Sequence, residues 1–271
     1  MSRLGIIAGS GGLPGKLIEA CRRDQRPFFV LGLKGQTDGS ILRDTSHAWA
    51  RLGATTESIS ILKSNGVDTL VMAGAIRRPT LAELRPDLRT LQVFAKLGLR
   101  ALGDDALLRT VTQELEKDGF RLLGAHEVEP ALMTPEGVLG KVTPSAEHQA
   151  DIDIGIRAAK ELGRLDIGQA SVVQQGIVLG LEAVEGTDAL LERCRKLRRK
   201  GRGGVLVKSC KPQQDRRVDL PSVGLRTVRR AFEAGLEGIA IEAGASLLLD
   251  REEVVAAADK LGLFILGFGT S

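Results

Sequence analysis

The chain has 271 residues, 43% of them hydrophobic and 27% charged, which is enough for two domains of ordinary size with their own cores. Much of its net charge of +4 comes from one basic run, 193–202 (RCRKLRRKGR). Such a run suits nucleic acid or an anionic membrane surface, or is the solvated end of a helix. Only 3% of residues are aromatic and Tyr is absent, which argues against base stacking and so against recognition of single-stranded RNA.

Short apolar segments alternate with amphipathic segments through the first half of the chain. The pattern predicts strands at 4–8, 27–33, 67–73 and 120–123, and helices at 13–23, 58–63, 88–102 and 105–117. This alternation is typical of a parallel sheet covered by helices on both faces. Residues 1–130 are therefore predicted to form an α/β domain with a parallel sheet.

The pattern breaks where three prolines and two glycines fall within 130–144, and we expect a linker over 131–144. Beyond it, strands 170–174 and 177–181 flank Gln175-Gly176 as a hairpin would. Further strands are predicted at 204–207, 238–241, 247–249 and 263–267, and helices at 147–162, 187–197, 223–234 and 251–261. A hairpin combined with parallel units predicts a second α/β domain with a mixed sheet over 145–271.

The segment 208–224 (KSCKPQQDRRVDLPSVG) has the highest density of charge beside prolines. Its cations, which include Lys208, Lys211 and Arg217, suit a polyanion such as a phosphate ester. A carboxylate among them, Asp215 or Asp219, suits a metal ion or an attacking water. The prolines keep the backbone out of regular helix and strand. The alternative is a solvated charged loop.

A glycine-rich turn, 8–14 (AGSGGLP), lies between the first strand and the first helix, where backbone N–H groups and the helix end can bind phosphate. It is not a dinucleotide fingerprint, because Pro14 replaces the third glycine and Lys34 follows the second strand, so a nicotinamide dehydrogenase is disfavoured. A tight turn without a ligand is the alternative. The candidate ligand contacts are Ser10, Gly11 and Gly12 here, with Gly74 and Ala75 at the end of the third strand.

Several other polar residues are candidates. Asp104 and Asp105 open a helix, either as N-caps or as ligands of a metal. Gln169 and Thr187 flank the hairpin and suit a polar pocket floor, although Thr187 could equally cap a helix. His126-Glu127 is not part of an H-E-x-x-H motif, which excludes zinc-protease chemistry.

The cellular location is indicated by what the sequence lacks. Three cysteines without paired spacing suggest no zinc or disulfide framework and favour a reducing compartment. No run approaches the roughly 20 apolar residues that cross a bilayer, and the N-terminus is not typical of a signal peptide. We expect a cytoplasmic protein, and a peripheral contact with the membrane stays open.

Taken in order, IAGSGGLP, GDDALLR, GAHEV, DIGQ, EGTDALL and KPQQDRRVDLPSVG resemble the LpxI-type UDP-2,3-diacylglucosamine pyrophosphatases of lipid A biosynthesis, and the resemblance spans the whole chain. It implies a magnesium-dependent hydrolysis that releases UMP and 2,3-diacylglucosamine 1-phosphate, known as lipid X. It also implies a Rossmann-like N-terminal domain and a separate C-terminal α/β domain, with the lipid product between them. The aspartate of the family's RVDLP segment, essential for turnover, is Asp219 here, whereas Cys210 and Gln213–Arg216 depart from the family pattern.

The resemblance assigns turnover to Asp219, and the residue chemistry described above supplies the other candidate roles. Catalysis falls to Asp219 with Lys208, Lys211 and Arg217; substrate binding to Ser10, Gly11, Gly12, Gly74, Ala75, Gln169 and Thr187; and Mg²⁺ to Asp219 with Asp104 and Asp105. The partners expected are UDP-2,3-diacylglucosamine and the inner face of the cytoplasmic membrane, with no nucleic acid; a homodimer stays open. The competing hypothesis is a non-catalytic protein that binds a nucleotide sugar or a lipid.

Overall fold

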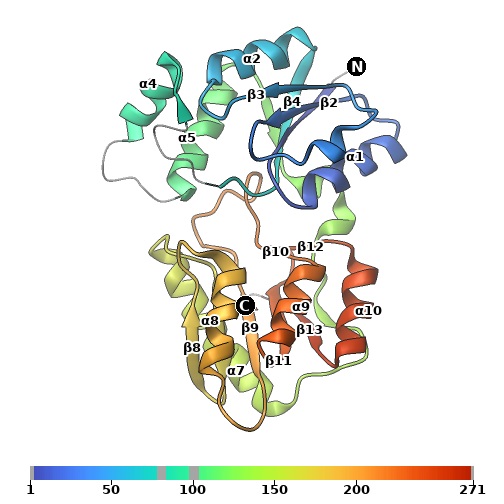
Figure 1. The fold of residues 1–271 in the computed structure, drawn as a ribbon, viewed down its shortest axis with the longest axis vertical. Helices are drawn as coiled ribbons and strands as arrows, with labels where there is room; N and C mark the ends of the chain where they lie inside the picture. Colours follow the sequence, from blue (N-terminus) through green and yellow to red (C-terminus); the bar gives the residue numbers. More distant parts are fainter. Residues whose placement is uncertain (1–2, 78–83, 98–103, 270–271) are drawn as a thin grey trace. The chain divides into compact units, whose positions relative to one another are not determined.

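The computed structural model describes residues 3–77, 84–97 and 104–269, and the chain divides into two compact units (Figure 1). The first unit comprises Met1–Pro130 together with Asp215–Asp219. The second comprises Ala131–Gln214 and Leu220–Ser271. The short segment Asp215–Asp219 therefore belongs to the first unit, although the residues before and after it in the sequence belong to the second.

The first unit is built on a parallel sheet of five strands in the order β3-β2-β1-β4-β5. Its strands are β1 (Arg3–Ala8), β2 (Phe28–Leu33), β3 (His47–Ala50), β4 (Val67–Ala73) and β5 (Arg121–Leu123). The chain reverses its direction of winding between β1 and β4, as in Rossmann-like sheets, and ligands of such sheets bind beyond the strand ends at this point. The predicted parallel-sheet domain is confirmed.

The helical segments of the first unit are α1 (Leu13–Arg23), η1 (Gly39–Leu42), α2 (Thr55–Ser64), α4 (Leu88–Leu97), α5 (Asp104–Lys117) and α6 (Ala125–Val128). Alternate residues of β2, Phe29 and Leu31, share a buried cluster with Leu62 of α2 and Leu115 of α5. Helices α1 and α6 instead contact each other and β4. A parallel sheet buried by helices explains why its strands are apolar runs rather than alternating ones.

The second unit contains a mixed sheet of six strands in the order β6-β13-β11-β9-β7-β8. Its strands are β6 (Gly137–Leu139), β7 (Ala170–Gln174), β8 (Ile177–Leu181), β9 (Gly204–Lys208), β11 (Leu236–Glu242) and β13 (Phe264–Phe268), and a separate pair joins β10 (Ser222–Val223) to β12 (Leu247–Leu248). Strands β9, β11 and β13 are mutually parallel, whereas β7–β8 is the predicted hairpin. Gln175 and Gly176 both have positive φ, as a two-residue hairpin turn requires. The predicted mixed sheet is confirmed.

Helices cover both faces of this second sheet. The helices are α7 (Ala146–Arg164), α8 (Gly186–Leu197), α9 (Leu225–Glu233) and α10 (Arg251–Leu261), with a short turn η2 (Pro130–Leu132) at the start of the unit. Val205 and Val207 of β9 pack in one cluster with Ile152 of α7. Leu206, between them, packs in the other cluster with side chains of α8, α9 and α10. The two-residue period of β9 thus separates two apolar layers.

Candidate active site

The glycine-rich turn and the end of β4 lie together, as the sequence predicts. The N–H of Ser10 donates to the carbonyl oxygen of Ala75 at 2.8 Å, and the N–H of Ala75 donates back to Ser10 at 3.0 Å. The Ser10 hydroxyl also donates to the Ala75 carbonyl at 2.8 Å. Gly12 is the N-cap of α1, and no side chain caps this helix end. Gly11 and Gly12 are exposed, so their backbone is accessible to a ligand.

Close backbone contact explains two of the glycines. A Cβ on Gly9 would lie 2.6 Å from the Ala75 carbonyl oxygen, and one on Gly74 would lie 2.4 Å from that of Ser10. Gly74 also has a φ of +91°, which side chains other than glycine rarely adopt. Gly11 has a positive φ too, but a Cβ there meets nothing within 4 Å. The two loops can therefore approach each other only with glycine at positions 9 and 74.

The RVDLP segment is held by an ion-pair network in the first unit. Asp215 accepts hydrogen bonds from the backbone N–H, Nε and Nη2 of Arg217, at 3.0, 3.0 and 2.7 Å. Nη1 of Arg217 donates to Oε1 of Glu116 at 2.8 Å. Hydrogen bonds from Arg217 lower the pKa of Asp215, and those to Asp215 and then Glu116 raise the pKa of Arg217. Arg217 is thus charged and is oriented by two carboxylates.

Asp219 lies at the end of the same turn. Its N–H and that of Val218 both donate to the Asp215 carbonyl oxygen, at 3.2 and 3.0 Å. Val218 packs against the buried cluster of the first unit, and Asp219 itself is half-buried. Backbone hydrogen bonds and one apolar contact therefore set the position of the Asp219 backbone.

Lys208 and Lys211 belong to the second unit, at the carboxyl end of β9. Lys208 is buried and its Nζ donates to the carbonyl oxygen of Ser222 at 3.0 Å. Nζ of Lys211 pairs with Asp166 Oδ1 at 2.7 Å. Between the two lysines, the Ser209 hydroxyl and the Cys210 N–H both donate to Oε2 of Glu242, at 2.5 and 2.9 Å. Glu242 is buried at the end of β11, and it fixes the backbone that carries both lysines.

Gln169 and Thr187 converge on a second buried carboxylate, that of Glu182. The Gln169 N–H donates to Glu182 Oε2 at 3.0 Å, and the Thr187 hydroxyl donates to Oε1 at 2.6 Å. The side-chain oxygen of Gln169 is buried and has no hydrogen-bond partner. Sequence reasoning named Gln169 and Thr187 as candidates, whereas it did not name Glu182 and Glu242, the carboxylates that the structure places beside the candidate residues. The available signal was an acid closing an apolar strand, as in LEGIAIE.

A complete metal site is not preformed in the described residues. Within 3–77, 84–97 and 104–269, no group of three or more His, Cys, Asp or Glu side chains could hold a metal ion. Asp104 and Asp105 form the first turn of α5, but their side chains lie outside the described part of the structure. Just before the RVDLP segment, Asp215 is paired with Arg217, and Asp219 within the segment is half-buried.

Family models match both halves of the chain. The model described as the LpxI N-terminal domain matches residues 3–132, and the one described as the LpxI C-terminal domain matches residues 135–266. The chain belongs to the LpxI family. A relative from Caulobacter vibrioides, named UDP-2,3-diacylglucosamine pyrophosphatase LpxI, is 48% identical over 274 residues. The match covers 98% of this chain and 98% of the relative.

Other comparisons add little to the LpxI assignment. The biotin carboxylase subunit of pyruvate carboxylase matches 64% of this chain and 35% of its own at 15% identity, with a TM-score of 0.26, too low to support an argument. As for the membrane, none of the helices within the described residues is long and apolar enough to cross a bilayer.

Proposed function

We propose that this LpxI-family protein hydrolyses the pyrophosphate of UDP-2,3-diacylglucosamine, producing UMP and 2,3-diacylglucosamine 1-phosphate. The observation that carries the proposal is the 48% identity, over 98% of both chains, with a relative named for this pyrophosphatase activity. The intact RVDLP turn, with Asp219 in a fixed backbone, supports it.

The chemistry asks for charge shielding and for activation of water. Water adds to one phosphorus, the bridging P–O bond breaks, and the bridging oxygen leaves on the other phosphate. Negative charge moves onto that phosphate, and fixed donors stabilise it. Backbone N–H groups of the glycine-rich turn and the cations Lys208 and Lys211 are the proposed donors. Asp219 is the proposed acceptor of the proton from water.

Magnesium is the proposed cofactor. The single carboxylate of Asp219 fits it, because Mg²⁺ in phosphate-transferring sites usually takes one or two carboxylates and fills its other positions with water and phosphate oxygens. Asp104 and Asp105 are the further candidates for holding it. When bound, the ion would neutralise charge on the phosphate oxygens.

The test is UMP release from purified, detergent-dispersed UDP-2,3-diacylglucosamine by the wild type and by Asp219→Ala. We expect Asp219→Ala to lose about 10²- to 10⁴-fold in kcat, the range for a general base, with an unchanged unfolding midpoint. Asp153→Ala, an exposed acid on α7, is the matched control and should keep full activity. EDTA should abolish turnover and magnesium should restore it.

Two outcomes would overturn the proposal. If the wild type binds the substrate with magnesium present but releases no UMP, the protein is a non-catalytic binding protein. If Asp219→Ala retains activity within about tenfold of the wild type, the acid has no role as a general base. Full activity after exhaustive chelation would remove the metal from the mechanism.

A further inference from the structure

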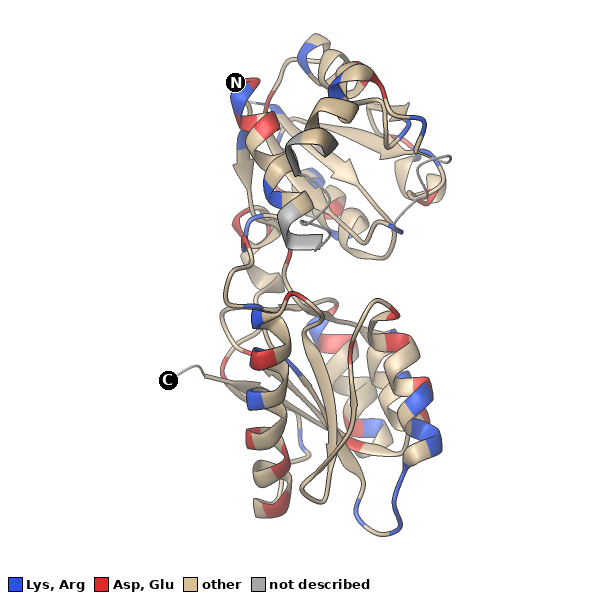
Figure 2. Cartoon of the chain, turned by 90° about the vertical axis from the view of Figure 1, so that its left-hand side faces the viewer, with Lys and Arg blue, Asp and Glu red and all other residues tan. Residues whose placement is uncertain are grey.

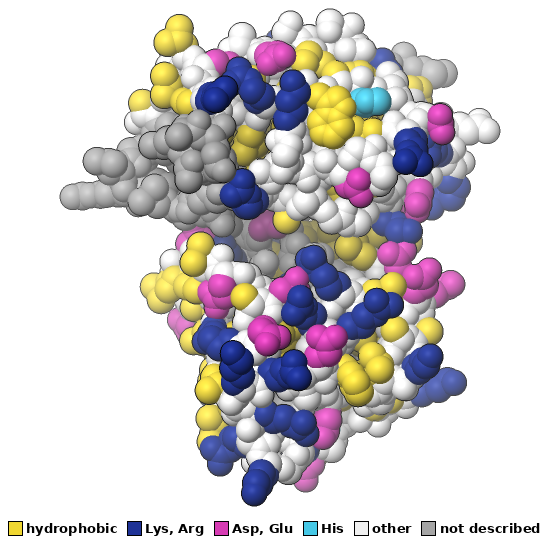
Figure 3. Space-filling view, in the orientation of Figure 1, with side chains coloured by type: hydrophobic (Ala, Val, Ile, Leu, Met, Phe, Trp, Pro, Cys, Tyr) yellow, Lys and Arg dark blue, Asp and Glu magenta, His cyan; other side chains and the backbone are white. Residues whose placement is uncertain are grey.

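A basic surface covers the C-terminal ends of α8 and α9 and the loop that follows α8. We call it the α8–α9 surface. Figure 3 shows Lys and Arg gathered over these helices of the second unit, and Figure 2 shows them along the last turns of α8 and its following loop. Its exposed cations are Arg195, Lys196, Arg198, Arg199, Lys200 and Arg229.

These six cations differ from their basic neighbours in having no acidic partner. Arg193, Arg226 and Arg230 pair with Glu185, Asp188 and Glu192. Among the described residues, by contrast, no carboxylate forms an ion pair with any of the six. Within the described part of the chain, the exposed acids Glu192 and Glu233 lie one helical turn from Arg195 and Arg229 but do not pair with any of the six. The six cations outnumber these two acids, so the surface keeps excess positive charge and attracts anions over about one Debye length, roughly 8 Å at physiological salt.

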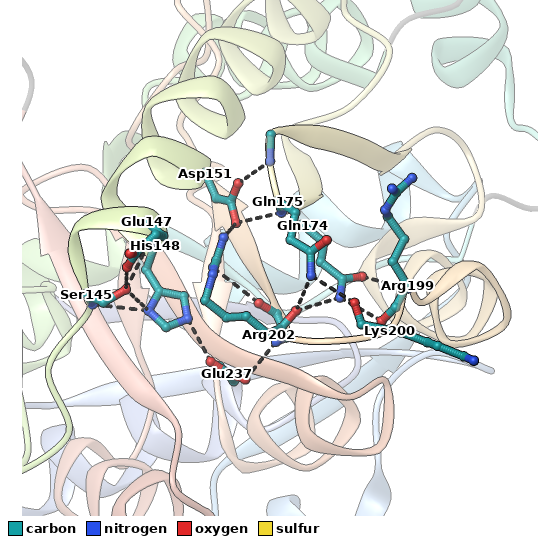
Figure 4. Close-up of polar contacts among 12 residues, drawn as sticks. Ser145, Glu147, His148, Asp151, Gln174, Gln175, Arg199, Lys200, Arg202 and Glu237 are labelled. Atoms are coloured by element: carbon teal, nitrogen blue, oxygen red, sulfur yellow. Dashed lines mark hydrogen bonds and ion pairs between the residues drawn. The ribbon is translucent and has the colours of Figure 1, made fainter.

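The loop 198–202 is held by the side-chain amides of Gln174, which is buried, and Gln175, which is exposed. The Gln174 amide donates to the carbonyl oxygens of Arg199 and Arg202, at 3.0 and 2.6 Å, and accepts from the Arg199 N–H at 2.9 Å (Figure 4). Gln175 donates to the Lys200 carbonyl oxygen at 3.0 Å. Gln174 is fully buried. Figure 4 shows the Arg199 and Lys200 side chains extending away from this network.

One ion pair and backbone hydrogen bonds to two carboxylates fix the end of the loop. Arg202 pairs with the buried Asp151 at 2.7 Å, and Asp151 also accepts the N–H groups of Gln175 and Gly176, at 3.0 and 2.7 Å. Glu237 accepts the Gly203 N–H at 2.7 Å. A loop that is merely solvated has no need of buried partners for its backbone, because water satisfies those groups. The network therefore presents Arg199 and Lys200 on a fixed backbone, which reduces the entropy lost on binding.

Two apolar side chains lie in the same surface. Leu197 is 49% exposed and Phe232 is 48% exposed. The Arg198 side chain lies over Gly235, where a Cβ would meet its Nη1 at 2.7 Å, and the Gly235 N–H bonds to the Phe232 carbonyl oxygen. The C-terminal ends of α8 and α9 are thus joined through Arg198. On a bilayer surface, the cations would contact the lipid headgroups, and the leucine and the aromatic ring would contact the acyl chains beneath them.

We propose that the α8–α9 surface docks the protein on a bilayer that contains anionic phospholipid. The choice of occupant rests on the proposed function, since a diacylated substrate resides in a membrane. Apolar exposure also favours lipid over nucleic acid, whose backbone binding uses cations without apolar partners. Docking at this surface is a binding step and leaves the chemistry at Asp219 unchanged.

The experiment is co-sedimentation of the full chain with lipid vesicles in the absence of substrate. One set of vesicles is pure phosphatidylcholine, and the other contains about 30% of the anionic lipid phosphatidylglycerol. The test variant is Arg199→Glu/Lys200→Glu. The control is Lys141→Glu/Arg157→Glu, which makes the same charge change at exposed positions outside the α8–α9 surface. Hydrolysis of detergent-dispersed substrate and binding to a DNA duplex are measured alongside.

We expect the wild type and the control to bind anionic vesicles, weakening as salt rises, and to bind neutral vesicles at least tenfold less. The test variant should bind anionic vesicles at least tenfold less than the control while hydrolysing dispersed substrate normally. Equal binding by the two variants, or wild-type binding to DNA but not to vesicles, overturns the proposal. Because dispersed substrate needs no vesicle, an inactive wild type would refute the proposed function separately.

Discussion

Glu242 offers the sharpest test of how the lysine-bearing segment is positioned. Glu242 is 4% exposed, and its carboxylate accepts hydrogen bonds from both the Ser209 hydroxyl and the Cys210 N–H. These donors are themselves 1% and 6% exposed at the residue level, so water cannot readily replace the lost acceptor. They lie between Lys208 and Lys211, and a shift of this backbone moves both cations.

Glu242→Ala leaves two buried donors without a partner. Each unpaired donor costs about 1–3 kcal/mol, so the two together cost about 2–6 kcal/mol. The net cost is smaller, because the variant no longer has to bury a carboxylate. We expect the free energy of unfolding of the second unit to fall by about 2–4 kcal/mol. Glu242→Gln is the matched control, because its amide oxygen can still accept both hydrogen bonds; it should remain within about 1 kcal/mol of the wild type.

The measurement is urea denaturation followed by circular dichroism, with kcat and KM determined under conditions where each variant is folded. Glu242→Ala should lower kcat/KM at least tenfold even when folded, because the lysines are displaced, whereas Glu242→Gln should keep most of the activity. An Ala variant with wild-type stability and wild-type kcat/KM would refute the reasoning that this carboxylate positions the segment.

Three further predictions concern the first unit. Gly74→Ala and Gly11→Ala both place a side chain at a positive φ, but only Gly74→Ala also creates a clash with the Ser10 carbonyl oxygen. In urea denaturation, Gly74→Ala should therefore lose more unfolding free energy than Gly11→Ala, by at least about 1 kcal/mol. Burial alone would raise the pKa of Asp87, but hydrogen bonds from Thr90 and Thr56 outweigh it and lower the pKa to about 2. The stability that Asp87 contributes is therefore complete above its ordinary pKa of 3.8 and lost as pH falls toward about 2; Asp87→Ala should cost about 1 kcal/mol at pH 7 and flatten the acid limb of a denaturation–pH profile. Arg217→Lys keeps the charge but cannot bind both oxygens of Asp215. If Arg217 orients the turn, this variant should lose as much kcat as Arg217→Ala. An active Lys variant would show that charge alone suffices.

Local patterns predicted the elements, and one general rule predicted part of the site. The carboxyl ends of neighbouring parallel strands meet at one edge of a sheet, so the turn after β1 and the end of β4 were expected to lie together, and Ser10 and Ala75 do pair. The Gln175-Gly176 hairpin followed from turn chemistry in the same way.

What sequence could not supply are contacts between distant segments. Strand β6 has three residues in a proline- and glycine-rich stretch, and it becomes a strand only because β13 offers it an edge. Strand β3, likewise, pairs with the edge of β2. Glu116 lies in a helix about 100 residues before Arg217, and neither pattern nor spacing links the two. Propensity gives no information on such partners, because tertiary contacts decide them.

The paired charges of the candidate site also bear on its cofactor. Charge density in the sequence suggested free cations for a diphosphate, yet Arg217 is shared by Asp215 and Glu116, and Lys211 pairs with Asp166. Each of these carboxylates offsets charge that a phosphate would otherwise meet, and Asp219 adds another negative group. A diphosphate brought to such residues needs positive charge beyond what they supply. That deficit is the electrostatic reason to expect a divalent cation with the substrate, and it predicts that substrate affinity, as well as turnover, falls when magnesium is removed.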